Sequence, residues 1–147
     1  MYNLKQLLIS GGDLSGMTLK NLSALIPLRD LCTLSFHELG AVDLAPLEKM
    51  DQIKDLSVMY SYEVENISAI GAMTQLDHLM LCGLLVEDLN FLVTLPDSVE
   101  LDMCGIEVKD VGSIDVKKWK RFPNRDICEI EVRDPYWRYI DLSELRE

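Results

Sequence analysis

The chain has 147 residues, of which 48% are hydrophobic and 27% are charged. This composition is that of an ordinary globular domain able to bury a core, and it excludes a disordered chain. The net charge of -11 argues against nucleic acid or an anionic membrane surface as a partner, because phosphate groups would repel the chain, and it favours a basic protein.

The first residues carry no basic region followed by an apolar core, so no secretion signal is expected. No apolar run approaches the roughly 20 residues that a membrane span requires. These features predict a cytoplasmic protein that does not enter a membrane. Because no CxxC pair occurs, we expect free thiols at the four cysteines, which are Cys32, Cys82, Cys104 and Cys128.

A repeat of 22 or 23 residues runs along most of the chain. The first strand is expected at Leu7-Leu8-Ile9, followed by a glycine-rich loop over residues 10–16. The corresponding position of each later strand is occupied in turn by Leu34, Leu56, Leu79 and Leu101. The last two repeats share a Cys-Gly pair, Cys82-Gly83 and Cys104-Gly105, so the agreement goes beyond generic apolar positions.

The spacing within one repeat predicts its local structure. Leu79 and Leu81 alternate as the inward side chains of a short strand. The later apolar residues fall at intervals of three, which suits a 3₁₀ or irregular helical return, and they are Val86, Leu89, Leu92 and Leu95. One unit cannot bury its apolar edge alone, so stacked units are expected to share a core and form a parallel sheet on one side.

The pattern LxxLxLxxxxVxDLxxLxxL, seen over Leu76–Leu95, resembles the leucine-rich-repeat family, in its short internalin-like and phosphatase-regulator-like form. The resemblance covers about residues 4–116 and implies an α/β solenoid with a concave parallel sheet and helical returns on the convex side. The family often keeps an Asn in the turn after the strand. Here Leu39, Leu84 and Ile106 stand there, so we expect an apolar and less regular turn.

The repeat fails from Asp115, and residues 117–147 are expected to form an atypical C-terminal cap of one domain that spans residues 1–147. Within it, 127–132 alternates like one more strand, 134–137 is expected to turn the chain, and 141–144 suggests a short helix. Trp119 and Phe122 are expected to pack over the last coil. Tyr136, Trp137 and Tyr139 are cap residues that could alternatively anchor a partner.

The side chains that flank each inward pair are expected on the concave face. The predicted partner-binding residues are His37, Met59, Tyr60, His78, Met80, Glu100 and Asp102, with Glu129 and Glu131 from the cap strand. The methionines and the tyrosine resemble an interface core, and the acidic residues could steer a basic ligand. Two alternatives stay open: a one-residue register error would turn a methionine into the core, and the acidic residues could be a solvated face.

A metal site or a Cys-His nucleophile is conceivable at His78, Cys82, Asp102 and Cys104. Closely spaced ligand pairs are missing, and the two cysteines follow from the repeat. A flat sheet offers no oxyanion hole. The basic aromatic stretch over residues 117–125 is a weak nucleic-acid signal in an acidic chain. We therefore expect no enzyme, no catalytic residues, no metal, no cofactor and no nucleic-acid partner.

The function favoured by these features is protein binding by a dedicated inhibitor, such as an immunity protein that occludes a basic toxin. This hypothesis rests on analogy with small acidic binders. The alternatives are a general adaptor or regulatory subunit, for which about five repeats offer only a modest surface, and an enzyme of unknown type. The sequence leaves the oligomeric state open.

Overall fold

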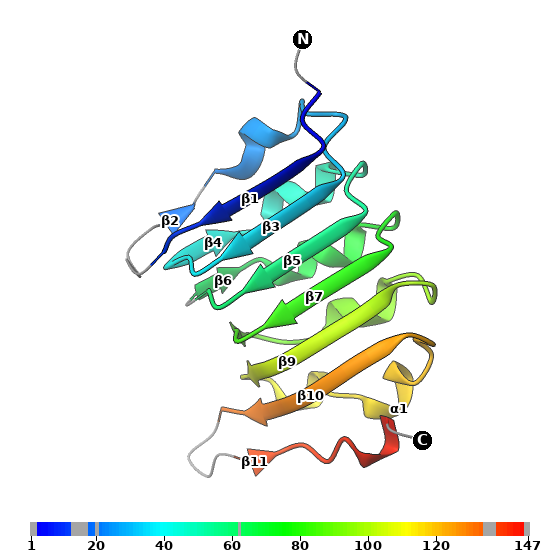
Figure 1. Ribbon diagram of the computed structural model, residues 1–147. Helices are drawn as coiled ribbons and strands as arrows, with labels where there is room; N and C mark the ends of the chain where they lie inside the picture. Colours follow the sequence, from blue (N-terminus) through cyan, green and yellow to red (C-terminus); the bar gives the residue numbers. More distant parts are fainter. Residues whose placement is uncertain (1–2, 13–17, 20, 62, 134–137, 146–147) are drawn as a thin grey trace.

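The computed structural model describes residues 3–12, 18–19, 21–61, 63–133 and 138–145. Its main feature is a sheet whose strands stack along the length of the molecule, with β1 and β11 at opposite ends (Figure 1). Six strands pair in parallel: β1 (Gln6–Ser10), β3 (Thr33–His37), β5 (Asp55–Met59), β7 (His78–Cys82), β9 (Glu100–Val108) and β10 (Arg125–Val132). β11 (Arg138–Tyr139) joins β10 in antiparallel orientation. The predicted parallel sheet is confirmed.

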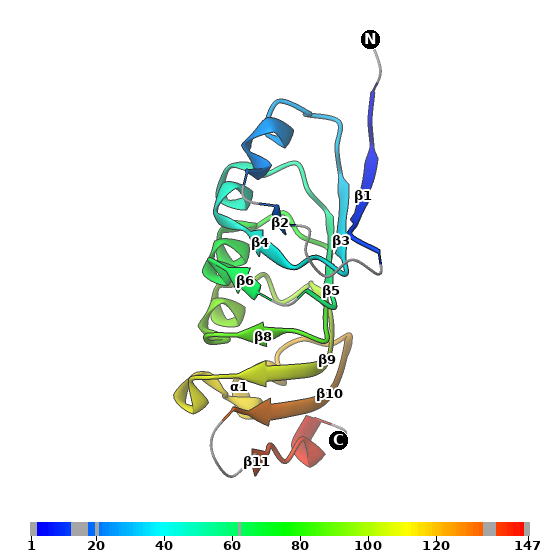
Figure 2. The ribbon, with the colours of Figure 1, turned by 90° about the vertical axis from the view of Figure 1, so that its left-hand side faces the viewer.

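The returns on the other side of the sheet are 3₁₀ helices, as the intervals of three predicted, and they line the side opposite the strands (Figure 2). Asn21 and Asp110 cap η1 and η5 by accepting a backbone N–H, at 3.0 Å from Ser23 and 2.9 Å from Gly112. The helical returns are η1 (Leu22–Leu25), η2 (Ala45–Lys49), η3 (Ile67–Ala72), η4 (Asn90–Thr94) and η5 (Val111–Ser113).

Each coil changes direction at a corner that follows its strand. The corner residue has a positive φ in five successive coils: Glu38 (54°), Tyr60 (53°), Gly83 (62°), Gly105 (62°) and Glu129 (53°). A buried side chain comes next, such as Leu39, Leu84 or Ile106. In these five coils the left-handed residue supplies the bend, and the expected apolar side chains Leu39, Leu84 and Ile106 are buried in the core.

Short strands after the corners form a second layer that the sequence did not predict. β2 (Thr18–Leu19), β4 (Ala41–Asp43) and β6 (Glu63–Glu65) make one sheet, whereas β8 (Leu85–Val86) pairs with β9. Val58 and Val64 are six residues apart, but Leu81 and Val86 are five apart. The shorter corner shifts β8 out of register with β6, and among the described residues the two strands do not pair.

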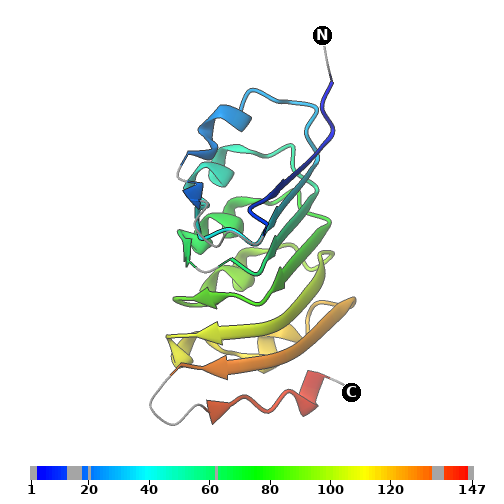
Figure 3. The ribbon, with the colours of Figure 1, turned by 60° about the vertical axis from the view of Figure 1, so that its left-hand side comes forward.

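One continuous apolar core runs through the stack, from Leu22 on η1 to Leu145 on η6 (Ser143–Leu145). At its C-terminal end, α1 (Val116–Trp119) and the residues after it place Trp119 and Phe122 in this core, as predicted. The expected strand at 127–132 forms as β10, so the parallel stack continues beyond residue 116 (Figure 3). The expected turn at 134–137, with Tyr136 and Trp137, and most of the expected loop over 10–16 lie outside the described residues.

Arg125 takes a core position in this closing coil, because its Cα pairs with that of the inward-facing Leu101. Its guanidinium donates to the carbonyls of Phe122 at 2.7 Å, Lys120 at 3.2 Å and Leu145 at 3.1 Å. The side chain thus ties the segment after α1 to the last helix. No sequence pattern indicated this role, because a charged residue at a position that is apolar in the other coils suggests that the repeat has ended.

Candidate protein-binding face

The strands present three rows of half-buried or exposed side chains on the concave side, and strand pairing gives their order. The first row is Gln6, Thr33, Asp55, His78 and Glu100; the second is Leu8, Ser35, Ser57, Met80, Asp102 and Asp126; the third is Ser10, His37, Met59, Cys82, Cys104 and Cys128. His37, Met59, His78, Met80, Glu100 and Asp102 therefore lie on the face where the sequence placed them. Met59 and Met80 are not core residues.

The placement of Glu129 and Glu131 on this face was wrong. Cys128 pairs with Cys104, so the alternation of β10 puts Asp126 and Cys128 on the concave side. Glu129 occupies the corner, and Glu131 follows the corner and pairs with Glu107. Aligning Cys128 with the repeated cysteines would have given the right register.

Tyr60 also lies at a corner, but its ring reaches back to the third row. The ring is 54% exposed and meets the His37 ring edge-on, with 5.6 Å between centroids. It covers Gly83, where an added Cβ would come within 2.5 Å of a ring carbon. The Cys82 thiol donates a hydrogen bond of 3.5 Å to the Tyr60 hydroxyl oxygen, and this contact raises the pKa of Tyr60.

The face is acidic and holds no Lys or Arg in its three described rows. His78 lies among the carboxylates, with its Nε2 2.8 Å from Asp102 Oδ2 and its Nδ1 4.0 Å from Asp55 Oδ1. The Asp126 carboxylate makes no ion pair or hydrogen bond with the described residues, although its backbone pairs with β9. The same bias appears along the chain, since residues 29–116 contain 17 of its 25 Asp and Glu but only four of its 14 Lys and Arg.

Three thiols stand side by side in the third row, at Cys82, Cys104 and Cys128. A hydrogen bond with Cys128 is the largest of several causes, burial among them, that raise the pKa of Cys104 to about 12. Cys104 is therefore a protonated thiol near neutral pH, not a thiolate nucleophile.

The histidine and the cysteines of the hypothetical Cys-His site do not come together. His78 contacts Asp102, whereas Cys82 lies four residues further along the same strand, roughly 13 Å away at about 3.3 Å per residue. A general base must lie within hydrogen-bond reach of its nucleophile, and this distance is far greater. Among the described residues, no group of three or more His, Cys, Asp or Glu is arranged to hold a metal ion.

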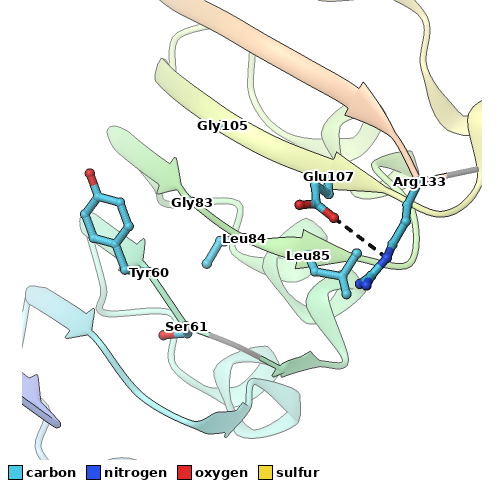
Figure 4. Close-up of a pocket in the computed structure, with 8 residues that line it drawn as sticks. All are labelled: Tyr60, Ser61, Gly83, Leu84, Leu85, Gly105, Glu107 and Arg133. Atoms are coloured by element: carbon cyan, nitrogen blue, oxygen red, sulfur yellow. Dashed lines mark ion pairs between the residues drawn. The ribbon is translucent and has the colours of Figure 1, made fainter. Parts of the chain in front are cut away.

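Two hollows lie near the C-terminal half of the sheet, one on the concave face and one beside the corners. One, of about 240 Å³, lies between the second and third rows and is lined by Met80, Leu81, Cys82, Asp102, Met103, Cys104, Asp126 and Cys128. The other, of about 490 Å³, lies beside the corners that follow β5, β7 and β9, where Tyr60, Ser61, Gly83 and Gly105 line it together with Leu84, Leu85, Glu107 and Arg133. Figure 4 shows it between the Tyr60 ring and the Glu107–Arg133 ion pair, whose closest atoms are 3.9 Å apart.

The cap offers one further exposed aromatic side chain, Tyr139, which is 72% exposed on β11. It pairs with Glu131, which follows the corner of β10, so Tyr139 lies beside the part of β10 that has left the concave face. Within the part of the chain that the structure describes, the helices are too short and too polar to cross a membrane.

Comparison with known proteins identifies the architecture. No protein-family model matches the chain, and no curated protein matches it in sequence. Among solved structures, internalin C2 from Listeria monocytogenes superimposes with a TM-score of 0.64 over 90% of this chain, at 21% sequence identity. The match covers 55% of the internalin C2 chain, so the present chain spans little more than half of that protein.

Proposed function

We propose that this chain, which folds as a leucine-rich-repeat solenoid, is a protein-binding module whose partner carries a basic surface. The observation that carries the proposal is the composition of the concave rows over β7, β9 and β10. Methionine and cysteine side chains form a soft apolar centre there, with Asp102, Glu100 and Asp126 beside it. An apolar centre within a charged surround is the usual anatomy of a protein interface.

The size of the face determines how a partner would sit. Six strands about 4.8 Å apart and five residues long cover roughly 24 by 16 Å, or about 400 Å². A stable interface needs about 800 Å² on each partner. The partner would therefore also cover the corner that holds Tyr60 or the cap that holds Tyr139. Acidic side chains on the middle coils would accelerate its approach.

The finer proposal is that the module is a dedicated inhibitor, such as an immunity protein that occludes a basic toxin or effector in the cytoplasm. Support comes from the chemistry of the face, where the His78 ring is engaged by Asp102 and the Cys104 thiol stays protonated. Such a face suits occlusion better than catalysis.

The test is capture of partners from host lysate with the tagged chain and with two variants. The double variant Met59→Glu/Met80→Glu puts charge into the apolar centre. Val93→Glu makes the same type of change at an exposed position on η4, on the convex side. We expect one stoichiometric partner with the wild type and with Val93→Glu, and its loss with the double variant.

An activity assay of the captured partner separates the finer proposal from a general adaptor. An inhibitor abolishes the partner's activity at one equivalent, whereas an adaptor leaves it active. A partner retained by the double variant would contradict binding through the concave face, and attention would then move to the cap.

A further inference from the structure

The hollow between the second and third rows has walls of two kinds. Met80, Cys82, Cys104 and Cys128 supply a thioether and three thiols, which are polarisable and weakly hydrated. Leu81 and Met103 point into the core, so they line the floor through their backbone. Asp102 and Asp126 follow Met80 in the second row, so they stand on the side opposite the thiols. One trough thus offers an apolar wall and an anionic wall.

Its volume limits what can occupy it. Small-molecule sites usually measure about 300–1,000 Å³, and this trough holds about 240 Å³. It is open to the concave side along β7, β9 and β10, where a protein partner would lie. An occupant of this size is a single side chain of that partner.

Neither aspartate pairs with a Lys or Arg among the described residues, and only Asp102 has a partner there, the His78 ring. Asp102 and Asp126 are in register on neighbouring strands, so their carboxylates lie side by side. Like charges in that position repel each other. The His78 Nε2 engages only Oδ2 of Asp102, and both oxygens of Asp126 lack a partner among the described residues. The free oxygens form an acceptor set that one planar, forked donor can bridge.

We propose that this trough receives an arginine side chain of the partner protein, with the guanidinium on Asp102 and Asp126 and the aliphatic stem against Met80 and the thiols. Arginine combines an apolar stem with a charged fork that matches carboxylate geometry, which lysine lacks. The inference rests on the proposed function and specifies the group by which the partner is recognised.

The test uses a defined peptide, so it does not depend on finding the partner. The ¹⁵N-labelled chain is titrated with acetyl-Gly-Ser-Arg-Ser-Gly-amide and with the same peptide carrying citrulline, which keeps the shape of arginine but has no charge. We expect the arginine peptide to shift the amide signals of Met80, Cys82, Asp102 and Cys104 in a saturable manner. The citrulline peptide should bind at least about tenfold more weakly.

Two variants sharpen the result. Asp126→Asn removes one carboxylate from the trough and should weaken the arginine peptide at least about fivefold, with the rest of the spectrum unchanged because Asp126 is exposed. Glu48→Gln removes an exposed carboxylate from η2 on the convex side and should leave binding unchanged. This control shows whether the peptide binds through a contact in the trough or is only attracted by the overall negative charge of the chain.

Equal shifts with both peptides, shifts confined to other regions, or no saturable shift would overturn the inference. If the Met59→Glu/Met80→Glu variant loses a captured partner while the arginine peptide gives no shift, the binding function stands and the arginine site fails. If the peptide binds at the trough but no partner is captured, the site stands and the proposed function is the part in doubt.

Discussion

The two halves of the stack differ in both their ends and their concave faces. At the N-terminal end, β1 pairs with β3 and with no other strand among the described residues, and its inward residues Leu7 and Ile9 remain half-buried. At the C-terminal end, Trp119 and Phe122 are fully covered. The second row follows the same division, with the neutral side chains Leu8, Ser35 and Ser57 in one half and Met80, Asp102 and Asp126 in the other. The half with a chemically distinctive face is thus the half whose last coil packs on the buried Trp119 and Phe122.

The largest expected effect is on stability at the closed end. Trp119→Ala should lower the free energy of unfolding by about 3–5 kcal/mol, because it opens a cavity under the last coil. Leu7→Ala at the open end should cost only about 1–2 kcal/mol, since that side chain is half-buried. Urea unfolding followed by circular dichroism measures both. Equal losses would remove the distinction between the two ends.

The second prediction concerns Arg125, whose guanidinium binds backbone carbonyls in the C-terminal coil. Arg125→Met keeps a long side chain but leaves three backbone carbonyls without their donor, and should cost about 2–3 kcal/mol. Arg29→Met breaks only an exposed ion pair with Asp51 and should change stability by less than about 0.5 kcal/mol. A small effect at Arg125 would mean that the cap is held by apolar contacts alone.

The third prediction compares two corner glycines, Gly83 and Gly105, which share a φ of 62°. Only Gly83 lies under the ring of Tyr60, which belongs to the preceding coil. Gly105→Ala makes only ordinary van der Waals contact, at 3.7 Å from the Gly83 backbone nitrogen, and should cost about 1–2 kcal/mol from backbone strain alone. Gly83→Ala has the same strain and also displaces the Tyr60 ring, so it should cost more. A crystal structure or the tyrosine ring resonances would show whether the ring moves. Equal costs would mean that the ring adapts without loss.

The last effect on stability belongs to the thiol row and appears only at alkaline pH. The folded protein raises the pKa of Cys104 from 9.0 to about 12, so the unfolded chain releases this proton first. The contribution of Cys104 to stability is therefore complete below pH 9 and is lost as the pH rises from about 9 to 12. Cys104→Ser should lose less stability than the wild type over this interval. Parallel pH profiles would argue against the hydrogen bond with Cys128.

The sequence was sufficient to predict the features that repeat. Leu34, Leu56, Leu79 and Leu101 indicated the strands, and the apolar residues at intervals of three indicated the 3₁₀ returns, because the same burial is required in every coil. The same register located His78, Met80 and Asp102 on the concave face.

Features that occur once could not be predicted in this way. The interval between Met103 and Ile127 is 24 residues, and this longer coil hid the correspondence of Cys128 with Cys104 and placed Glu129 and Glu131 wrongly. The break between β6 and β8 depends on one residue at the corner, which affects backbone pairing but leaves the apolar pattern intact. The position of Arg125 depends on carbonyls that only the folded cap brings together.

The most direct test of the account compares two substitutions in the same concave row. Met80→Glu and Ser35→Glu introduce the same charge at half-buried positions, one in each half of the stack. Affinity for the captured partner, measured by isothermal titration calorimetry, should fall at least about 30-fold for Met80→Glu and less than about threefold for Ser35→Glu. Equal losses, or a larger loss at Ser35, would contradict binding through the C-terminal half of the face.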